Sequence, residues 1–193
     1  MADNKFLIAG LGNPGKEYDK TRHNAGYMLV DKIIKKYKFP KLETEEKFSS
    51  QMTTGIFLPD IKLILAKPLT FMNNSGDAIQ RISKYFKIPS QYIYIAHDDL
   101  DIDLGEYKIQ YTKGPRQHNG INSIERYLGS SAFNKIRIGI ENRGDLRHKI
   151  AGKDYVLSKF AKQEQDTLQN SIFENLLEDL QNKILDTFRQ GEK

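Results

Sequence analysis

The chain has 193 residues, of which 38% are hydrophobic, and its formal net charge is +5. This length predicts one domain spanning residues 1–193, because a chain of this size buries a sizeable core. The absence of cysteine excludes disulfides, thiolate metal sites and a cysteine nucleophile. No apolar run reaches the roughly 20 residues of a membrane helix, and no signal peptide is recognisable at the start. We therefore expect a cytoplasmic protein that does not bind membranes.

The positive charge is concentrated in the second half of the chain. Residues 105–153 hold ten Lys or Arg and four Asp or Glu, a net +6, which leaves −1 for the remainder. A partner with a phosphate backbone requires such a basic region. A solvated surface has the same composition, so charge alone leaves both interpretations open.

In chain order, the first predicted elements are a strand at 6–9, ended by glycines, and a helix at 25–38. Apolar residues at helical spacing give that helix one buried face, Asn24 is a plausible N-cap, and Pro40 follows its end. Two strands at 51–58 and 61–67 are joined by a Pro-Asp turn.

The later elements continue the alternation of strands and helices. Helices are expected at 74–86 and 119–128, and strands at 92–96, 106–111 and 135–140. The tail at 162–190 carries an apolar residue every four positions (Leu168, Ile172, Leu176, Leu180, Ile184, Phe188), typical of one or two helices docked on a sheet. The pattern predicts a single-domain α/β three-layer sandwich, with a twisted mixed sheet flanked by helices.

The segment from Gly10 to Gly15 satisfies the dinucleotide pattern GxGxxG after a strand. We reject that interpretation, because a dinucleotide site needs a helix to begin inside the motif, and Asn-Pro-Gly is turn chemistry. A tight turn remains the simple explanation. It leaves Asn13 able to point into a cleft at the end of the strand.

A histidine on a loop before a helix is the second candidate. Loops that leave a rigid sheet often carry catalytic groups, and imidazole accepts a proton near neutral pH, so His23 is a candidate base. A lone histidine in this position is more often a cap or a surface residue.

Four acids follow the predicted strand at 92–96, namely Asp98, Asp99, Asp101 and Asp103. The calcium-loop pattern fails, because Leu104 and Gln110 occupy its glycine and glutamate positions. A magnesium site from Asp98 and Asp101 stays open. One carboxylate at a strand end could instead orient a histidine.

Two further segments lead from a loop into a predicted helix. Asn73 and Asn74 are either helix caps or donors to a carbonyl oxygen that gains negative charge. His118 and Asn119 follow Arg116, and Asn119 is either a cap or a ligand for phosphate or ribose. Without a GxSxG nucleophile motif, these side chains favour water activation over a covalent nucleophile.

Taken together, the segments closely resemble bacterial-type peptidyl-tRNA hydrolase. The matching motifs are GLGNPGKEYDKTRHNAG from Gly10, KPLTFMNNSG from Lys67, AHDDLDIDLG from Ala96, HNGINSI from His118, RIGI from Arg137 and DYVLSKF from Asp154. Their order and spacing cover roughly residues 5–160. The resemblance implies a single α/β domain that hydrolyses the ester joining a peptide to the 3′-terminal ribose of tRNA. Because the acidic cluster fits no standard ligand spacing, we expect no metal or other cofactor.

The resemblance also implies a role for each matching residue. His23 would be the base that activates water, and Asp98 would orient it. Asn13 and Asn73 would position the substrate and its oxyanion. The remaining roles are binding roles: Tyr18 and Met72 as cleft walls, His118 and Asn119 at the acceptor end of tRNA, and Lys108 and Arg137 at tRNA phosphates.

Two departures from the family pattern stand out. Lys113-Gly114-Pro115-Arg116-Gln117 replaces a glycine-rich run, which predicts a stiffer, more charged loop. Asp99 stands where the family commonly has glutamate, which keeps the charge. The basic segment 141–153 matches weakly and receives no role. A noncatalytic RNA-binding relative and a metal-dependent nuclease remain the alternatives, and a monomer is expected.

Overall fold

A seven-stranded mixed sheet, in the order β2-β3-β4-β1-β5-β7-β6, forms the centre of the molecule. This computed structural model describes residues 4–191, so residues 1–3 of the amino-terminal segment considered above lie outside the described residues. The strands are β1 Lys5–Gly10, β2 Glu43–Glu45, β3 Ser50–Leu58, β4 Ile61–Pro68, β5 Ile93–Asp103, β6 Tyr107–Tyr111 and β7 Asn134–Glu141. Pairing is parallel from β4 through β1 and β5 to β7, and antiparallel at both edges.

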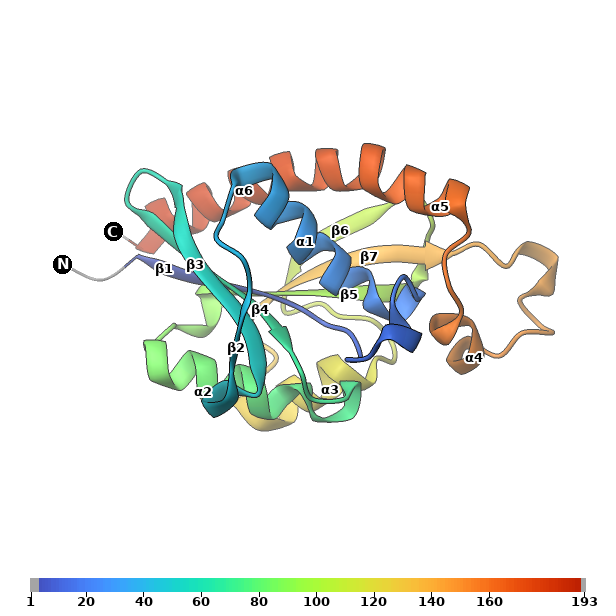
Figure 1. The fold of residues 1–193 in the computed structure, drawn as a ribbon, viewed down its shortest axis with the longest axis horizontal. Helices are drawn as coiled ribbons and strands as arrows, with labels where there is room; N and C mark the ends of the chain where they lie inside the picture. The colour runs from blue at the N-terminus through green and yellow to red at the C-terminus, as the bar shows by residue number, and fades with distance from the viewer. Residues whose placement is uncertain (1–3, 192–193) are drawn as a thin grey trace.

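Helices cover both faces of this sheet (Figure 1). They are α1 Ala25–Tyr37, α2 Ser75–Phe86, α3 Asn119–Leu128, α4 Gly152–Leu157, α5 Lys162–Thr167 and α6 Phe173–Gly191. Helices α1 and α6 pack on one face, and α2 and α3 on the other. The predicted three-layer α/β sandwich is confirmed. Among residues 4–191, every helix is too short or too polar to cross a lipid bilayer.

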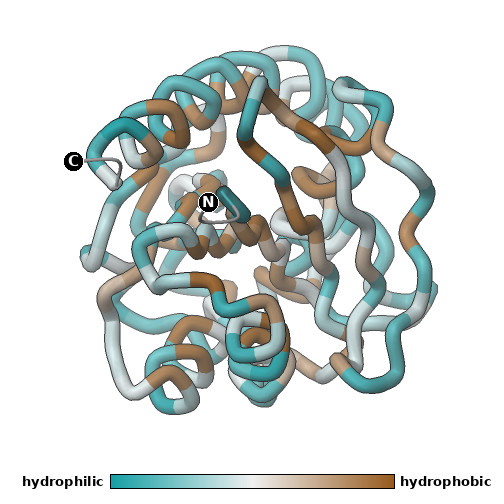
Figure 2. The backbone as a smooth tube through the Cα atoms, turned by 90° about the vertical axis from the view of Figure 1, so that its left-hand side faces the viewer, coloured by the Kyte–Doolittle hydropathy of each residue, from teal (hydrophilic) through white to brown (hydrophobic). Residues whose placement is uncertain are grey.

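The alternation of side chains along the strands divides the core into two clusters. In β1, Phe6 and Ile8 face α1 and α6, whereas Leu7 and Ala9 face α2 and α3, and all four are fully buried. Successive side chains of a strand point to opposite faces, so a central strand buried on both sides is apolar throughout. Figure 2 shows these hydrophobic strands inside helices whose colours alternate along their turns.

The carboxy-terminal helices dock on the sheet as the spacing predicts. Helix α5 continues through a π-helical segment, Leu168–Ile172, into α6. The stripe from Leu168 to Ile184 is buried against the first core cluster, and Phe188 packs at its margin. The prediction of one long helix or two shorter ones, docked through this face, is confirmed.

Strand β5 differs most from its prediction, because it runs on to Asp103 instead of ending at Ala96. Its acidic half pairs with β7, in the register Asp98↔Ile138 and Asp99↔Gly139. A run of aspartates in a sequence normally indicates a loop. Here the two buried aspartates, Asp98 and Asp99, remain in a strand because histidine and arginine side chains bind their carboxylates. Strand β2 and helix α4 were not predicted, since neither has a clear periodic pattern.

Close backbone contact fixes α1 against the ends of β1 and β5. A Cβ atom at Gly26 would collide with the carbonyl oxygen of Ala96 and with the backbone of Leu11. The Leu11 N–H donates to the Ala96 carbonyl at 2.8 Å, and the Tyr27 N–H donates to the Leu11 carbonyl at 3.2 Å. Only glycine permits this approach, which brings the turn before α1 beside β5.

We expect Leu176→Ala to lower the free energy of unfolding by about 2–5 kcal/mol, because this side chain on the core-facing side of α6 is fully buried. Asn182→Ala, at an exposed position of the same helix, is the matched control and should change it by less than about 0.5 kcal/mol. Urea unfolding of both variants measures the difference. Equal effects would contradict docking through the apolar stripe.

Candidate functional site

A cleft of about 640 Å³ lies at the carboxyl ends of the central strands. Its lining comes from the turns after β1 and β4, from β5, from the start of α3 and from α4. The lining residues are Asn13, His23, Phe71, Met72, Asn73, Asp98, Leu100, Gln117, His118, Asn119, Gly152, Lys153, Val156 and Leu157. Seven of the ten predicted site residues are therefore together, although they are spread over more than a hundred positions of the sequence.

The centre of the cleft is a histidine–aspartate pair. His23 lies in the 3₁₀ turn Arg22–Asn24, and its Nδ1 is 2.8 Å from Oδ1 of Asp98. Burial alone lowers the pKa of His23, but the charge and hydrogen bond of Asp98 outweigh burial and raise it above its ordinary value. Burial alone would raise the pKa of Asp98, yet the neighbouring imidazoles hold it well below its usual range. Asp98 is therefore ionised at neutral pH.

The same carboxylate oxygen has a second imidazole partner. Nε2 of His118 is 3.0 Å from Oδ1 of Asp98, and the His118 side chain is buried. His118 also caps α3, because its Nδ1 accepts the N–H groups of Gly120 and Ile121. The alternative that Asn119 caps this helix is wrong. Asn119 is the first residue of α3 and is exposed to the cleft.

Asn13 is held in place by both its backbone and its side chain. Its Oδ1 accepts the Met72 N–H at 3.0 Å, which leaves the N–H groups of its carboxamide for the cleft. The side chain of Asn24 bonds to both backbone groups of Asn13, at 2.9 and 3.0 Å. Asn24 occupies the N-cap position of α1 as predicted, but its side chain makes no capping hydrogen bond and instead fixes the Asn13 turn.

Met72 and Asn73 line the cleft from the turn after β4, Met72 buried and Asn73 exposed. Asn74 does not cap α2 through its side chain, which accepts a hydrogen bond from Tyr127 instead. Tyr18 lies outside the lining, in the 3₁₀ turn Lys16–Tyr18. Its carbonyl oxygen accepts two hydrogen bonds from Thr21.

Lys108 and Arg137 are register partners on β6 and β7, away from the lining of the cleft. Lys108 is exposed, whereas Arg137 donates through Nε to Asp99 at 2.7 Å and through Nη1 to Gln110 at 2.8 Å. The Arg137 guanidinium is thus already paired with a buried carboxylate. A tRNA phosphate at this position would therefore share the Arg137 guanidinium with Asp99.

The acids of β5 serve separate partners. Asp98 binds the two histidines, Asp99 binds Arg137, and Oδ2 of Asp101 accepts the Arg116 N–H at 3.0 Å. This last bond anchors the loop that departs from the family pattern. A magnesium site shared by Asp98 and Asp101 therefore has no support in their geometry.

One set of side chains within residues 4–191, namely His23, Asp98 and His118, brings potential ligand atoms within 4.8 Å of one another. The hydrogen bonds of His118 oppose metal binding there. Its Nδ1 accepts two backbone N–H groups, so the neutral ring carries its hydrogen on Nε2, the atom that faces Asp98. A nitrogen that carries hydrogen is not a metal ligand.

Sequence reasoning missed the apolar wall of the cleft, formed by Phe71, Leu100, Val156 and Leu157. Phe71 and Leu157 keep 62% and 48% of their surface exposed. Large apolar side chains at exposed positions are the available signal, because they fit no buried face of a helix or strand. Gly152 and Lys153, in the weakly matched basic segment, also line the cleft.

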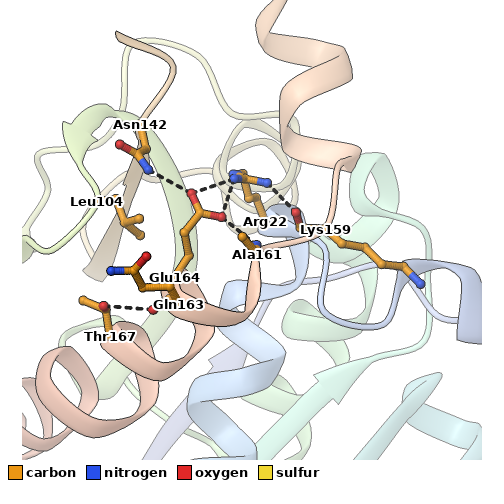
Figure 3. A pocket seen from close by; sticks show the side chains of 8 residues that line it. All are labelled: Arg22, Leu104, Asn142, Lys159, Ala161, Gln163, Glu164 and Thr167. Atoms are coloured by element: carbon orange, nitrogen blue, oxygen red, sulfur yellow. Dashed lines mark hydrogen bonds and ion pairs between the residues drawn. The ribbon is translucent and has the colours of Figure 1, made fainter.

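A second missed feature is a buried ion pair that clamps the His23 turn to the chain after α4 (Figure 3). Arg22 Nη2 donates to both carboxylate oxygens of Glu164, at 2.8 and 2.7 Å, and its Nη1 donates to Ser158 and to the Lys159 carbonyl. The guanidinium lies 4.2 Å from the ring centre of Tyr155 in α4. Because Arg22 precedes His23, this clamp fixes the turn that carries the histidine relative to the α4 wall.

Comparison with known proteins gives one consistent family. The family model described as peptidyl-tRNA hydrolase matches residues 7–190. A protein named peptidyl-tRNA hydrolase from Bacillus pumilus (strain SAFR-032) is 40% identical over 167 residues, covering 86% of each chain. One of the same name from Neisseria meningitidis serogroup C is 37% identical over 176 residues, covering 91% of this chain and 89% of that one.

Solved structures agree with this match. The crystal structure of peptidyl-tRNA hydrolase from Acinetobacter baumannii superposes with a TM-score of 0.78 and 31% identity, covering 97% of this chain and 96% of that one. A crystal structure of a peptidyl-tRNA hydrolase in complex with N-propanol gives a TM-score of 0.81 and 32% identity, covering 98% and 95%.

We expect Glu164→Gln to lower the free energy of unfolding at pH 7 by about 3 kcal/mol, because it leaves the buried Arg22 without its charged partner. Burial alone would raise the pKa of Glu164, but hydrogen bonds from Asn142 and the Ala161 N–H, together with Arg22, lower it. The ionised Glu164 therefore stabilises the folded protein fully above pH 4.5, the ordinary pKa of a glutamate. This stabilisation is lost as the pH falls through the lower pKa that Glu164 has in the folded protein.

Guanidinium unfolding of wild type and Glu164→Gln between pH 3 and pH 7 measures this difference, which should shrink as the pH falls. Glu45→Gln is the matched control, since Glu45 forms an exposed pair with Lys47 and should cost less than about 1 kcal/mol. A difference that does not change with pH would contradict the role of the ionised Glu164.

Proposed function

The chain belongs to the peptidyl-tRNA hydrolase family, and we propose that it cleaves the ester between a peptide and the 3′-terminal ribose of tRNA. The products are a free peptide acid and a reusable tRNA. The observation that carries this proposal is the His23–Asp98 pair, 2.8 Å apart at the base of a cleft lined by carboxamides. This arrangement supplies a base, its orienting acid and donors for an oxyanion, which is what hydrolysis of an activated ester needs.

His23 is the proposed general base. Its Nδ1–H donates to Asp98, so the lone pair is on Nε2 and is free to accept a proton from water. The resulting hydroxide attacks the ester carbonyl, and the ionised Asp98 stabilises the imidazolium that forms. When the tetrahedral intermediate collapses, the imidazolium returns the proton to the ribose oxygen, and the C–O bond breaks.

The asparagines are the proposed oxyanion donors. Because Oδ1 of Asn13 accepts the Met72 N–H, the carboxamide presents its N–H groups to the cleft in a fixed direction. Asn73, exposed on the next turn, supplies a second carboxamide. A donor aimed at developing negative charge in this way is typically worth about 10²–10³ in kcat.

The remaining cleft residues are proposed to hold the substrate. Asn119 contacts the acceptor end of tRNA beside His118, and Met72 forms part of the wall. Lys108 and Arg137 attract tRNA phosphates from the β6–β7 surface. Tyr18, which lies outside the lining, would contact only a substrate that extends beyond the cleft.

We further propose that the protein acts as a monomer in the cytoplasm, where translation releases peptidyl-tRNA, and needs no metal or cofactor. A metal-dependent nuclease would lose its activity in EDTA and shorten the tRNA. Incubation with an N-blocked aminoacyl-tRNA in EDTA should instead release the blocked amino acid and leave full-length tRNA. No release at any pH from 6 to 9 would overturn the proposed function.

We expect His23→Ala to reduce kcat by at least about a hundredfold, because general base catalysis typically contributes 10²–10⁴-fold. Affinity for tRNA should remain near wild type, since the imidazole is not proposed to hold the nucleic acid. Single-turnover hydrolysis and filter binding measure the two quantities. Near-full activity in this variant would contradict the assignment of the base.

The rate should decline on acidification, because a base acts only when neutral. The pKa of His23 is raised above 6.5 by Asp98, so kcat/KM should fall below a midpoint that lies above pH 6.5. A pH–rate profile from pH 5 to 9 locates this midpoint. A midpoint below pH 6 would contradict the proposed His23–Asp98 interaction.

Binding of tRNA should weaken as salt rises, because Lys and Arg contacts release counterions from phosphate. We expect Lys108→Ala to reduce the slope of log Kd against log salt by about 1. Lys35→Ala, exposed on α1 across the sheet from this surface, should leave the slope unchanged. Equal slopes in all three proteins would contradict the phosphate contact of Lys108.

A further inference from the structure

His118 joins the start of α3 to the carboxylate of the proposed catalytic pair. Its Nε2 is 3.0 Å from Oδ1 of Asp98, and its Nδ1 is 3.1 Å from the Gly120 nitrogen and 3.3 Å from the Ile121 nitrogen. The side chain is only 4% exposed. Both ring nitrogens are therefore engaged within the protein, and the ring has no polar atom left for substrate.

These contacts fix the tautomer of His118. Two backbone N–H groups point at Nδ1, which must therefore be an acceptor, and the ring hydrogen is on Nε2. A second hydrogen on Nδ1 would face both N–H groups and remove the cap of α3. His118 thus donates to Asp98 through Nε2 while its Nδ1 caps this helix end.

A single oxygen of Asp98 consequently accepts two N–H groups. His23 donates to Oδ1 at 2.8 Å, and His118 donates to the same atom at 3.0 Å. The two imidazole rings lie 5.2 Å apart. A donor that binds a carboxylate withdraws part of its negative charge from any other partner.

We infer that His118 is a positioning residue for the reaction, which fixes the Asp98 carboxylate and limits the negative charge that it presents to His23. This inference rests on the proposed function, in which His23 is the base. The capping of α3 is thereby coupled to the basicity of a side chain on another segment. A purely structural cap would have no such effect.

Other charged and titratable groups lie around the His23–Asp98 pair. A substitution of His118 alone leaves these groups unchanged. His97 in β5 donates from Nδ1 to the Asp98 carbonyl at 2.7 Å, and burial lowers its pKa well below the ordinary value. Lys153 of α4 lines the same cleft. Arg22, beside His23, is paired with Glu164, and Arg137 is paired with Asp99.

Two substitutions separate the two functions of His118. In His118→Asn, the carboxamide oxygen takes the place of Nδ1 and caps α3, since asparagine is a favoured N-cap, but nothing reaches Asp98. In His118→Gln, the longer side chain carries an N–H group to the place of Nε2, and the cap is lost. Ile124→Val, a buried change in α3 remote from Asp98, controls for loosened packing.

The test is an NMR titration of the His23 imidazole, with thermal unfolding of each protein. In His118→Asn, Asp98 is freed for His23, so the titration midpoint should rise by about half a pH unit or more with little change in Tm. In His118→Gln the midpoint should stay near wild type, with a lower Tm. In Ile124→Val only Tm should fall.

An unchanged midpoint in His118→Asn would overturn the inference, as would equal shifts in His118→Asn and Ile124→Val. The titration reads the His23 ring whether or not substrate turns over. Failure of the proposed function, seen as full activity in His23→Ala, is therefore distinguishable from failure of this inference.

Discussion

The buried carboxylate of Asp98 organises this molecule, because one of its oxygens joins two segments that are far apart in the chain. His23 comes from the turn before α1, and His118 comes from the cap of α3 on the other face of the sheet. A charge this deeply buried is stable only when donors surround it. The two imidazoles meet that need, and in doing so they place His23, the proposed base, at the open end of the central strands.

The rest of the fold brings these groups within hydrogen-bonding distance. The missing side chain of Gly26 lets α1 contact the backbone around Ala96, which carries the His23 turn to β5. The Arg22–Glu164 clamp holds the other side of that turn and couples it to α4. The proposed base, the proposed oxyanion donors and the apolar wall thus lie on segments that are each held in place separately, as a pre-organised site requires.

The sequence predicted the layers and most of the site, because these depend on local patterns. Buried strands read as apolar runs, and the tail reads as a stripe every four residues. Seven of the residues that line the cleft were found as a set, through the family resemblance carried by six motifs in a fixed order. Contacts of Lys108 and Arg137 with tRNA phosphates remain predictions. The Nε–H group of Arg137 already donates to Asp99.

What the sequence could not supply was the pairing of side chains across distant segments. Asn24 looks like a helix cap, but its side chain holds Asn13, and the actual cap of α3 is His118 instead of Asn119. The aspartates after Ala96 look like a loop or a metal site. They extend β5 instead, because histidine, arginine and backbone donors that are remote in sequence neutralise them.

The most direct test of this account is kcat/KM for an N-blocked aminoacyl-tRNA, measured against pH in EDTA with Asp98→Asn and wild type. Without the carboxylate, His23 loses both its orientation and the charge that raises its pKa. The account predicts a fall of at least about a hundredfold, with the acidic midpoint moved to lower pH. A wild-type rate and midpoint in Asp98→Asn would contradict it.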